Sequence, residues 1–308
     1  MPDENLREEK RRVKSFYDTF GWCRNTKGTY NDTALFVDAH LNATLRPYYQ
    51  RTDERVRRNL RPQGAYFLDA GSGPVPYESY LALSAGYRFR VCADFSELAL
   101  REARSRLGTK GRYVCADITR LPFKDGVFDA IFSAHVIYHI PADEQGRAIS
   151  ELQRALSPGA TGVIVYASPN PWCTRIAEGV VAAKRRLERI PGVLPLWRAL
   201  RRRRAPAPPS ARATGPTPAG ASPPKLYYHA HSNEWLRGTS RPDCPTEVQC
   251  FSTVDRIFTR TLIPRNAMGR WLMGAIYRLE ELFPRVMSRI GCYPMLILTK
   301  RPPSREPR

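Results

Sequence analysis

The stretch Y-F-L-D-A-G-S-G-P-V-P-Y-E-S-Y-L, residues 66–81, decides the fold. Its apolar start predicts a buried strand that stops at Asp69, and Gly71 and Gly73 then form a tight turn into a helix. Such a turn usually cradles a phosphate through backbone N–H groups. Here the third glycine of G-x-G-x-x-G is missing, two prolines offer no N–H, and no Gly-Lys-Ser/Thr follows. The loop therefore predicts a ligand without phosphate, and Asp69 at its mouth favours a cationic one.

Short apolar runs alternate with helical patterns from residue 65 to residue 167. The expected strands are 65–69, 89–94, 113–116, 128–133 and 162–167, and the expected helices are 77–85, 96–107 and 142–156. Strands that alternate with helices indicate a parallel sheet covered on both faces, and right-handed crossovers make it doubly wound.

The chain divides into four parts. Residues 1–60 predict an N-terminal helical cap, and 61–170 a cofactor-binding core. A basic helical insertion and a Pro-rich stretch without core-forming residues, read as a disordered linker, occupy 171–224. The fold resumes over 225–300, with a short helix after Ser232 as N-cap, strands at 248–258 and 293–299, and a helix at 266–290 between those strands. The predicted class is a doubly wound, seven-stranded Rossmann-like α/β sheet with helical insertions.

Three aspartates, Asp69, Asp94 and Asp117, end or follow the first three expected strands. The carboxyl ends of parallel strands are where ligands bind in open α/β sheets. S-adenosylmethionine, which has a sulfonium, an ammonium, a ribose diol and an adenine, fits these residues. Asp94 is placed to accept both ribose hydroxyls, and Asp117 with the N–H of Ile118 to read the adenine edge.

The chain resembles the class I S-adenosylmethionine-dependent methyltransferases, of the small-molecule, type 11-like branch that includes quinone, sterol and sugar methylating enzymes. The segments that carry the resemblance are D-A-G-S-G at 69–73, V-C-A-D-F-S at 91–96, Y-V-C-A-D-I-T-R-L-P-F at 113–123, F-D-A-I-F-S-A-H-V-I-Y-H-I at 128–140 and L-Q-R-A-L-S-P-G-A at 152–160. The sequence departs from the family at Val75 and Pro76, where many members have a further glycine.

The resemblance implies the cofactor-binding residues by position. The residues implied are Asp69, Ala70, Gly71, Ser72 and Gly73 at the methionine end, Asp94 and Phe95 at the ribose, Asp117 and Ile118 at the adenine, and Ser133 and Ala134 beside the sulfonium. No metal is implied.

Methyl transfer to a hydroxyl needs a base near the sulfonium. Four histidines are candidates: His135 and His139 after the fourth strand, and His229 and His231 in K-L-Y-Y-H-A-H-S-N-E-W-L at 225–236. The substrate pocket is expected between the cap and that segment. Its candidate residues are Tyr17, Phe20, Trp22 and Tyr228.

The net charge of +20 favours an anionic partner. The basic amphipathic stretch 174–204 suits an anionic membrane surface or a lipid-linked substrate, and equally a lid helix with a solvated basic face. After the fourth strand stands Ser133-Ala134-His135-Val136, not the D/N-P-P-Y/F of base-nitrogen methylation, and no Pro-Cys of cytosine C5 methylation occurs. Nucleic acid is therefore not the expected partner.

Seven cysteines occur without a C-x-x-C pair or zinc-ligand spacing, and Cys92 and Cys115 are expected to be buried thiols in strands. With no apolar run long enough to span a bilayer and no signal-peptide pattern, a cytoplasmic protein is expected, with peripheral membrane contact as the alternative. The predicted activity is methyl transfer to a hydroxyl of a small or lipid-linked molecule. Two other readings stay open: an RNA methyltransferase recruited by the basic segments, and an inactive binding protein of this fold.

Overall fold

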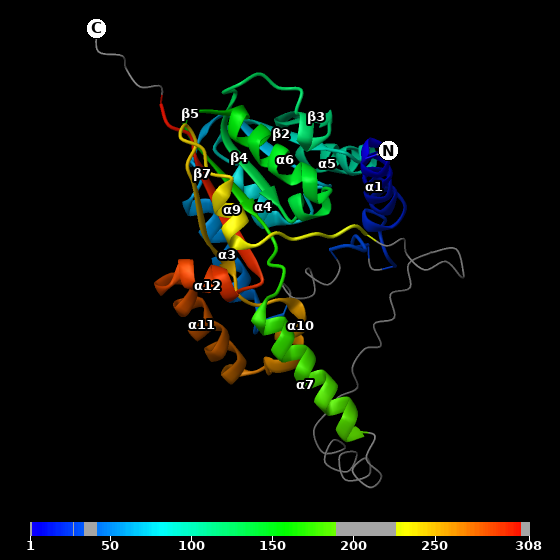
Figure 1. The fold of residues 1–308 in the computed structure, drawn as a ribbon, viewed down its shortest axis with the longest axis vertical. Coiled ribbons are helices and arrows are strands. Elements are labelled where there is room, and N and C mark those ends of the chain that lie inside the picture. The colour runs from blue at the N-terminus through cyan, green and yellow to red at the C-terminus, as the bar shows by residue number, and fades with distance from the viewer. Residues whose placement is uncertain (1, 27, 34–41, 189–225, 303–308) are drawn as a thin grey trace.

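A seven-stranded sheet forms the centre of the computed structural model, which describes residues 2–26, 28–33, 42–188 and 226–302. Helices cover both of its faces (Figure 1). The strand order is β3-β2-β1-β4-β5-β7-β6. The strands are β1 (Gly64–Ala70), β2 (Tyr87–Asp94), β3 (Gly111–Cys115), β4 (Phe128–Ala134), β5 (Leu156–Val165), β6 (Thr246–Ser252) and β7 (Tyr293–Thr299).

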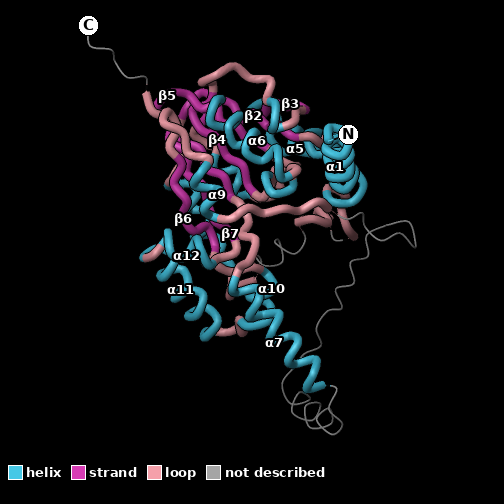
Figure 2. Tube along the Cα trace, viewed as in Figure 1, coloured by secondary structure: helices cyan, strands magenta, loops and turns pink. Residues whose placement is uncertain are grey.

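The helices that precede or connect these strands follow the predicted alternation in the core. They are α1 (Pro2–Phe16), a π-helical turn (Tyr17–Gly21), α3 (Arg46–Arg58), α4 (Glu78–Leu83), α5 (Glu97–Leu107), α6 (Ala142–Ala155), α7 (Trp172–Glu188), α9 (Asn233–Gly238), α10 (Arg256–Leu262), α11 (Ala267–Leu282) and α12 (Pro284–Ile290). Short 3-10 turns lie at Gly108–Lys110, Ile118–Arg120 and Ile137–His139. The Cα trace places α1 next to α5, at the β3 side of the sheet, and α7 projects from the lower end of the molecule beside α10 (Figure 2).

Neighbouring residues of the central strands pack into different layers, because side chains alternate across a strand. Leu68 joins a cluster with Ile149 and Leu152 of α6, whereas Phe67 joins another with Val56 of α3. Both faces of the sheet are buried, so β1 reads as a continuous apolar run rather than an alternating one.

The first five strands are parallel, as predicted, but the sheet is mixed. The seventh strand, β7, runs antiparallel to both β5 and β6. Two predicted elements were also wrong in extent. The strand expected at 248–258 ends at Ser252, because Asp255 caps α10 by accepting the N–H of Phe258 at 2.7 Å. The helix expected at 266–290 is broken at Phe283, where φ is −130° and Pro284 begins α12.

Two cysteines that were expected to be buried in strands differ in exposure. Cys92 is buried, but Cys115 is exposed at the carboxyl end of β3, the edge strand. The Pro-rich stretch 205–224 and the basic residues 201–204 lie outside the described residues. No described helix combines the length and apolar character that crossing a bilayer needs.

Candidate active site

A cavity of about 460 Å³ opens at the carboxyl ends of β1 to β4, beneath the N-terminal segment. A volume of this size is typical of sites that enclose a drug-sized ligand. Eight of the residues predicted to bind the cofactor line it: Asp69, Gly71, Ser72, Asp94, Phe95, Asp117, Ile118 and Ala134. The sequence-predicted Ala70, Gly73 and Ser133 are not among its lining residues, although each is close in the chain to one that is.

The glycine loop has a left-handed backbone at both glycines, with φ of +70° at Gly71 and +51° at Gly73. A Cβ on Gly71 would lie 2.5 Å from the methyl carbons of Val136, and one on Gly73 would lie 2.7 Å from the Trp22 ring. The glycines thus let two other parts of this chain approach the loop. Val75, where many family members have glycine, also has a positive φ, +51°. The local backbone is retained without the glycine, at the expense of strain in a β-branched residue.

Asp69 is held by a buried arginine. Arg90, 2% exposed, donates to Asp69 Oδ2 through both Nη2 and Nε, and also donates to the carbonyl of Tyr80. Arg90 neutralises the Asp69 carboxylate, so Asp69 does not by itself favour a cationic ligand, contrary to the expectation from the sequence.

Asp94 has both carboxylate oxygens engaged by the backbone. Oδ2 accepts the N–H of Gly73 and Oδ1 the N–H of Ser96, each at 2.8 Å. These bonds fix the carboxylate at the end of β2 and join the glycine loop to the start of α5. Burial raises the pKa of Asp94 to about 6, and the two N–H groups oppose that rise.

Asp117 contacts the N-terminal helix. Lys10 of α1 donates to Asp117 Oδ2 at 2.7 Å and forms an ion pair with Glu144 at 2.5 Å. The other oxygen, Oδ1, accepts the N–H of Thr119 at 2.9 Å and so caps the 3-10 turn after β3. Lys10 and this capping bond hold the pKa of Asp117 below its usual value against the effect of burial, so the carboxylate is ionised at neutral pH.

His135 and His139 both line the cavity. His139 Nδ1 lies 2.8 Å from the carbonyl oxygen of Tyr227, and a carbonyl only accepts, so Nδ1 carries the proton and Nε2 has the lone pair. His135 Nδ1 lies 3.1 Å from the hydroxyl of Tyr138. Burial lowers the pKa of each histidine to about 4, so both imidazoles are neutral at pH 7.

The other two histidines do not line the cavity. The ring of His231 stacks on Trp235 with centroids 3.8 Å apart, and its Nε2 lies 3.3 Å from the carbonyl oxygen of Ala142. The ring of His229 contacts that of His231 at 4.6 Å. His229 is exposed, whereas His231 packs on Trp235 of α9, so neither ring lies where the cofactor-binding residues were predicted.

Three of the four predicted pocket residues, Tyr17, Trp22 and Tyr228, line the cavity. Tyr17 stacks on Trp22 with centroids 5.1 Å apart. Phe20 does not line the cavity and contacts Phe16 on α1 instead. The aromatic helix face found in the sequence is therefore divided between the cavity and the packing of the cap.

Sequence reasoning missed a carboxylate in the cavity, Asp32. Burial raises its pKa to about 6, and Arg256, which also lines the cavity, opposes the rise. Three tyrosines of the wall, Tyr77, Tyr80 and Tyr293, were missed as well. No spacing or motif marks these residues, since they come from a turn, α4 and β7 and meet only in the fold.

A seven-stranded sheet with an antiparallel seventh strand, a glycine loop after β1 and acids at the ends of β2 and β3 defines the class I S-adenosylmethionine-dependent methyltransferase fold. The residues at the strand ends fit that cofactor, since the loop offers no phosphate cradle and backbone N–H groups hold the carboxylate of Asp94, the predicted ribose acceptor, at the end of β2.

Residues 68–164 match the methyltransferase domain family. The chain is 39% identical over 110 residues to demethylmenaquinone methyltransferase from Clavibacter sepedonicus, a segment that covers 35% of this chain and 43% of that protein. It is 32% identical over 162 residues to the probable tRNA methyltransferase 9B of Mus musculus, which covers 52% of this chain and 30% of that protein. The alignments thus span less than half of either relative.

Among solved structures, magnesium protoporphyrin IX methyltransferase from Synechocystis PCC 6803 with bound SAH superposes with a TM-score of 0.52. That match has 12% identity and covers 94% of this chain and 99% of the other, so it shows the fold alone. The family match and the shared fold together show that the protein carries a class I methyltransferase domain, whose cofactor is S-adenosylmethionine.

Proposed function

We propose that this protein transfers the methyl group of S-adenosylmethionine to a hydroxyl of a small or lipid-linked molecule, with Asp32 as the base. The proposal rests on one observation: Asp32 and His139 line the same cavity as the predicted cofactor-binding residues at the strand ends. The cofactor supplies an electrophilic methyl group, and the chain's own residues have to align the acceptor and take up its proton.

Asp32 suits the role of base better than the histidines. A general base works best when its pKa lies near the working pH. The pKa of Asp32 is raised to about 6, whereas those of His135 and His139 are lowered to about 4. His139 Nε2 has a free lone pair, so it can accept a hydrogen bond from the hydroxyl group that is to be methylated and thereby orient that group.

The rest of the wall supports an acceptor with an apolar or flat body. Aromatic side chains of Tyr77, Tyr80, Tyr138 and Tyr293 line the cavity together with Ile257. Such rings bury apolar surface and leave hydroxyls to bond polar edges. The name of the Clavibacter relative, demethylmenaquinone methyltransferase, is in keeping with an acceptor of this kind. A lipid-linked acceptor would also bring the basic stretch 174–204 to an anionic membrane surface.

The test is incubation with methyl-deuterated cofactor and a cell extract separated into small-molecule, lipid and RNA fractions. We expect the label on oxygen in the small-molecule or lipid fraction. Asp32→Asn is expected to lose roughly 100-fold or more of the labelling rate at an unchanged affinity for the cofactor. Asp143→Asn, an exposed acid on α6 outside the cavity, is the matched control and keeps the rate.

Three outcomes refute different parts of the proposal. Label on RNA alone refutes the acceptor class. Normal labelling by Asp32→Asn refutes Asp32 as base. No heat on titration with S-adenosylmethionine refutes the enzyme and favours an inactive binding protein.

RNA methylation is the second candidate, because the alignment with the mouse tRNA methyltransferase covers half of this chain and the net charge is +20. RNA binding by the basic residues would make log affinity fall with log salt concentration by roughly 0.7 per phosphate contact. A transfer RNA that binds with no such slope, or is not labelled, would eliminate this candidate.

A further inference from the structure

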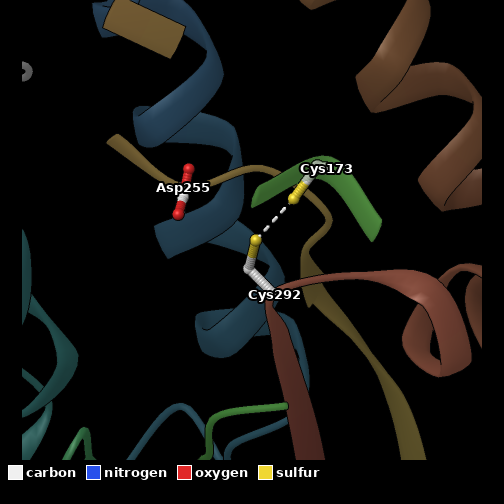
Figure 3. A group of neighbouring side chains, drawn as sticks. All are labelled: Cys173, Asp255 and Cys292. Carbon is white, nitrogen blue, oxygen red and sulfur yellow. Dashed lines mark hydrogen bonds between the residues drawn. The ribbon is translucent and has the colours of Figure 1, made fainter. Parts of the chain in front are cut away.

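Two cysteines from distant parts of the chain meet beside the part of the cavity that Asp255 and Tyr293 line. Cys173 lies in the first turn of α7 and Cys292 directly precedes β7, 119 residues further along. Their sulfur atoms point at each other at 2.6 Å, with Asp255 beside them (Figure 3). Two thiols that merely pack against each other do not approach so closely.

The surroundings hold the pair in place. Cys173 is fully buried and Cys292 is 4% exposed. Thr174 donates to Asp255 Oδ2 at 2.8 Å and lies 3.6 Å from the sulfur of Cys292. The first turn of α7, the cap of α10 and the start of β7 therefore meet at one point, and little freedom remains for the sulfurs to separate.

We propose that Cys173 and Cys292 form an intrachain disulfide, made by oxidation with a peroxide, that fastens the start of α7 to the strand carrying Tyr293. The separation in sequence explains why no cysteine spacing indicated it. The proposal is independent of the acceptor and of the activity.

The chemistry balances with hydrogen peroxide as oxidant. The Cys173 thiolate attacks the peroxide, becomes a sulfenic acid and releases hydroxide, which takes up the thiol proton to give water. The Cys292 thiol then attacks the sulfenic sulfur, forming the S–S bond and expelling a second water. The two thiols lose two electrons and two protons, and the peroxide is reduced to two waters. The interaction with the Cys292 sulfur lowers the pKa of Cys173, which makes Cys173 the attacking sulfur.

A metal ion at these residues is the competing interpretation, since Cys173, Asp255 and Cys292 offer ligand atoms within 4.8 Å of one another. Two thiolates on one tetrahedral zinc, each at about 2.3 Å from it, lie roughly 3.8 Å apart. The observed 2.6 Å is too short for that arrangement. Asp255 also already caps α10 and accepts from Thr174.

The cross-link lies beside the wall of the cavity that is furthest from the predicted adenine residues in strand order. Asp255, which lies beside the two sulfurs, and Tyr293, which follows Cys292, both line the cavity. The predicted cofactor residues Asp94, which ends β2, and Asp117, which follows β3, lie toward the other end of the sheet. Opening the bond should therefore loosen α7 and the cavity wall that Asp255 and Tyr293 line, and leave cofactor affinity unchanged within about twofold.

The direct experiment is thiol counting by mass spectrometry on the full chain. After treatment with hydrogen peroxide, denaturation and N-ethylmaleimide, we expect five of the seven cysteines to be labelled, and all seven when a phosphine reductant precedes the label. A peptide that joins Cys173 to Cys292 should appear only in the unreduced digest. Seven labels after peroxide, or a joined peptide between other cysteines, overturns the proposal.

Cysteine variants distinguish a disulfide from two thiols in van der Waals contact and from a bound metal ion. Reduction should lower the melting temperature of the oxidised protein by roughly 5–15 °C. Cys173→Ala and Cys292→Ala should each remove this response to reductant, and the double variant should melt no lower than the worse single one. The matched control Cys250→Ala, another buried cysteine, should keep the response. One zinc per chain in the purified protein, or a reductant response that survives Cys173→Ala, overturns the proposal.

Discussion

Lowering the pH from 7 to 5 is expected to weaken the binding of S-adenosylmethionine about tenfold, through Asp94. In the proposed binding mode the ribose hydroxyls donate to this carboxylate. Each of its oxygens already accepts a backbone N–H group, so both can accept a further donor only when the carboxyl is ionised. Protonation of the Asp94 carboxylate turns one of its acceptor oxygens into an O–H donor. The affinity should therefore follow the ionised fraction of Asp94.

The magnitude follows from the pKa of Asp94, which burial raises to about 6. About nine-tenths of the carboxyl is ionised at pH 7 and about one-tenth at pH 5. The dissociation constant should rise about tenfold between these values, a loss of about 1.4 kcal/mol. The effect on folding has the opposite sign. Because the folded pKa is raised, Asp94 stabilises the cofactor-free fold most below about pH 4 and loses that contribution as the pH rises through 6.

Calorimetric titration with S-adenosylmethionine at pH 5, 6 and 7 measures this dependence. Asp94→Asn should bind more weakly at pH 7 and show no change with pH. Asparagine has one acceptor oxygen for two buried N–H donors, so the variant should also lose about 1–3 kcal/mol of stability. Asp32→Asn is the control, because the pKa of Asp32 is also about 6 and it lines the same cavity.

Two results would refute the reasoning. An affinity that is constant from pH 5 to 7 would show that the ionised carboxylate of Asp94 is not needed. A tenfold change that persists in Asp94→Asn but disappears in Asp32→Asn would show that Asp32, and not Asp94, causes the pH dependence.

Other parts of the site give sharp predictions. Arg90→Met should lower the free energy of unfolding by about 3–5 kcal/mol, measured by urea denaturation, because it leaves Asp69 buried without its partner; a loss below 1 kcal/mol would contradict this. Gly73→Ala should lose at least tenfold in cofactor affinity, and Trp22→Ala should restore part of it by removing the clash at 2.7 Å; no rescue would mean that the positive φ alone matters. Ser232→Ala removes the cap of α9 and should lower the melting temperature by about 2–4 °C; an unchanged value would show that the cap is dispensable.

The core of the fold could be predicted because its signals are local. The apolar run into Asp69 and the glycine turn lie within one short segment, and the structure places β1 and α4 there. The seventh strand was predicted at its observed bounds, but its antiparallel pairing was not, since direction depends on the connection through α11 and α12 rather than on its own residues. The strand before α10 was predicted too long, because apolar residues continue past the capping Asp255.

The site was less accessible to sequence reasoning, because its partners are far apart in the chain. Asp94 could be found from its place after a strand, but the pairing of Asp69 with Arg90 could not, although the two lie on neighbouring strands. Histidines drew attention as bases because histidine titrates near neutral pH. Burial reverses that expectation, lowering the pKa of His139 and raising that of Asp32 into the useful range. Only the three-dimensional surroundings could distinguish them.

The N-terminal segment contacts all three parts of the predicted cofactor site. Lys10 of α1 contacts Asp117, Asp18 accepts the hydroxyl of the serine that caps α5, and Trp22 packs on Gly73. These contacts fall on the predicted adenine, ribose and methionine positions in turn, within thirteen residues of one segment. A cofactor bound at these predicted positions would lie under this segment, whose residues Lys10, Tyr17 and Trp22 line the same cavity.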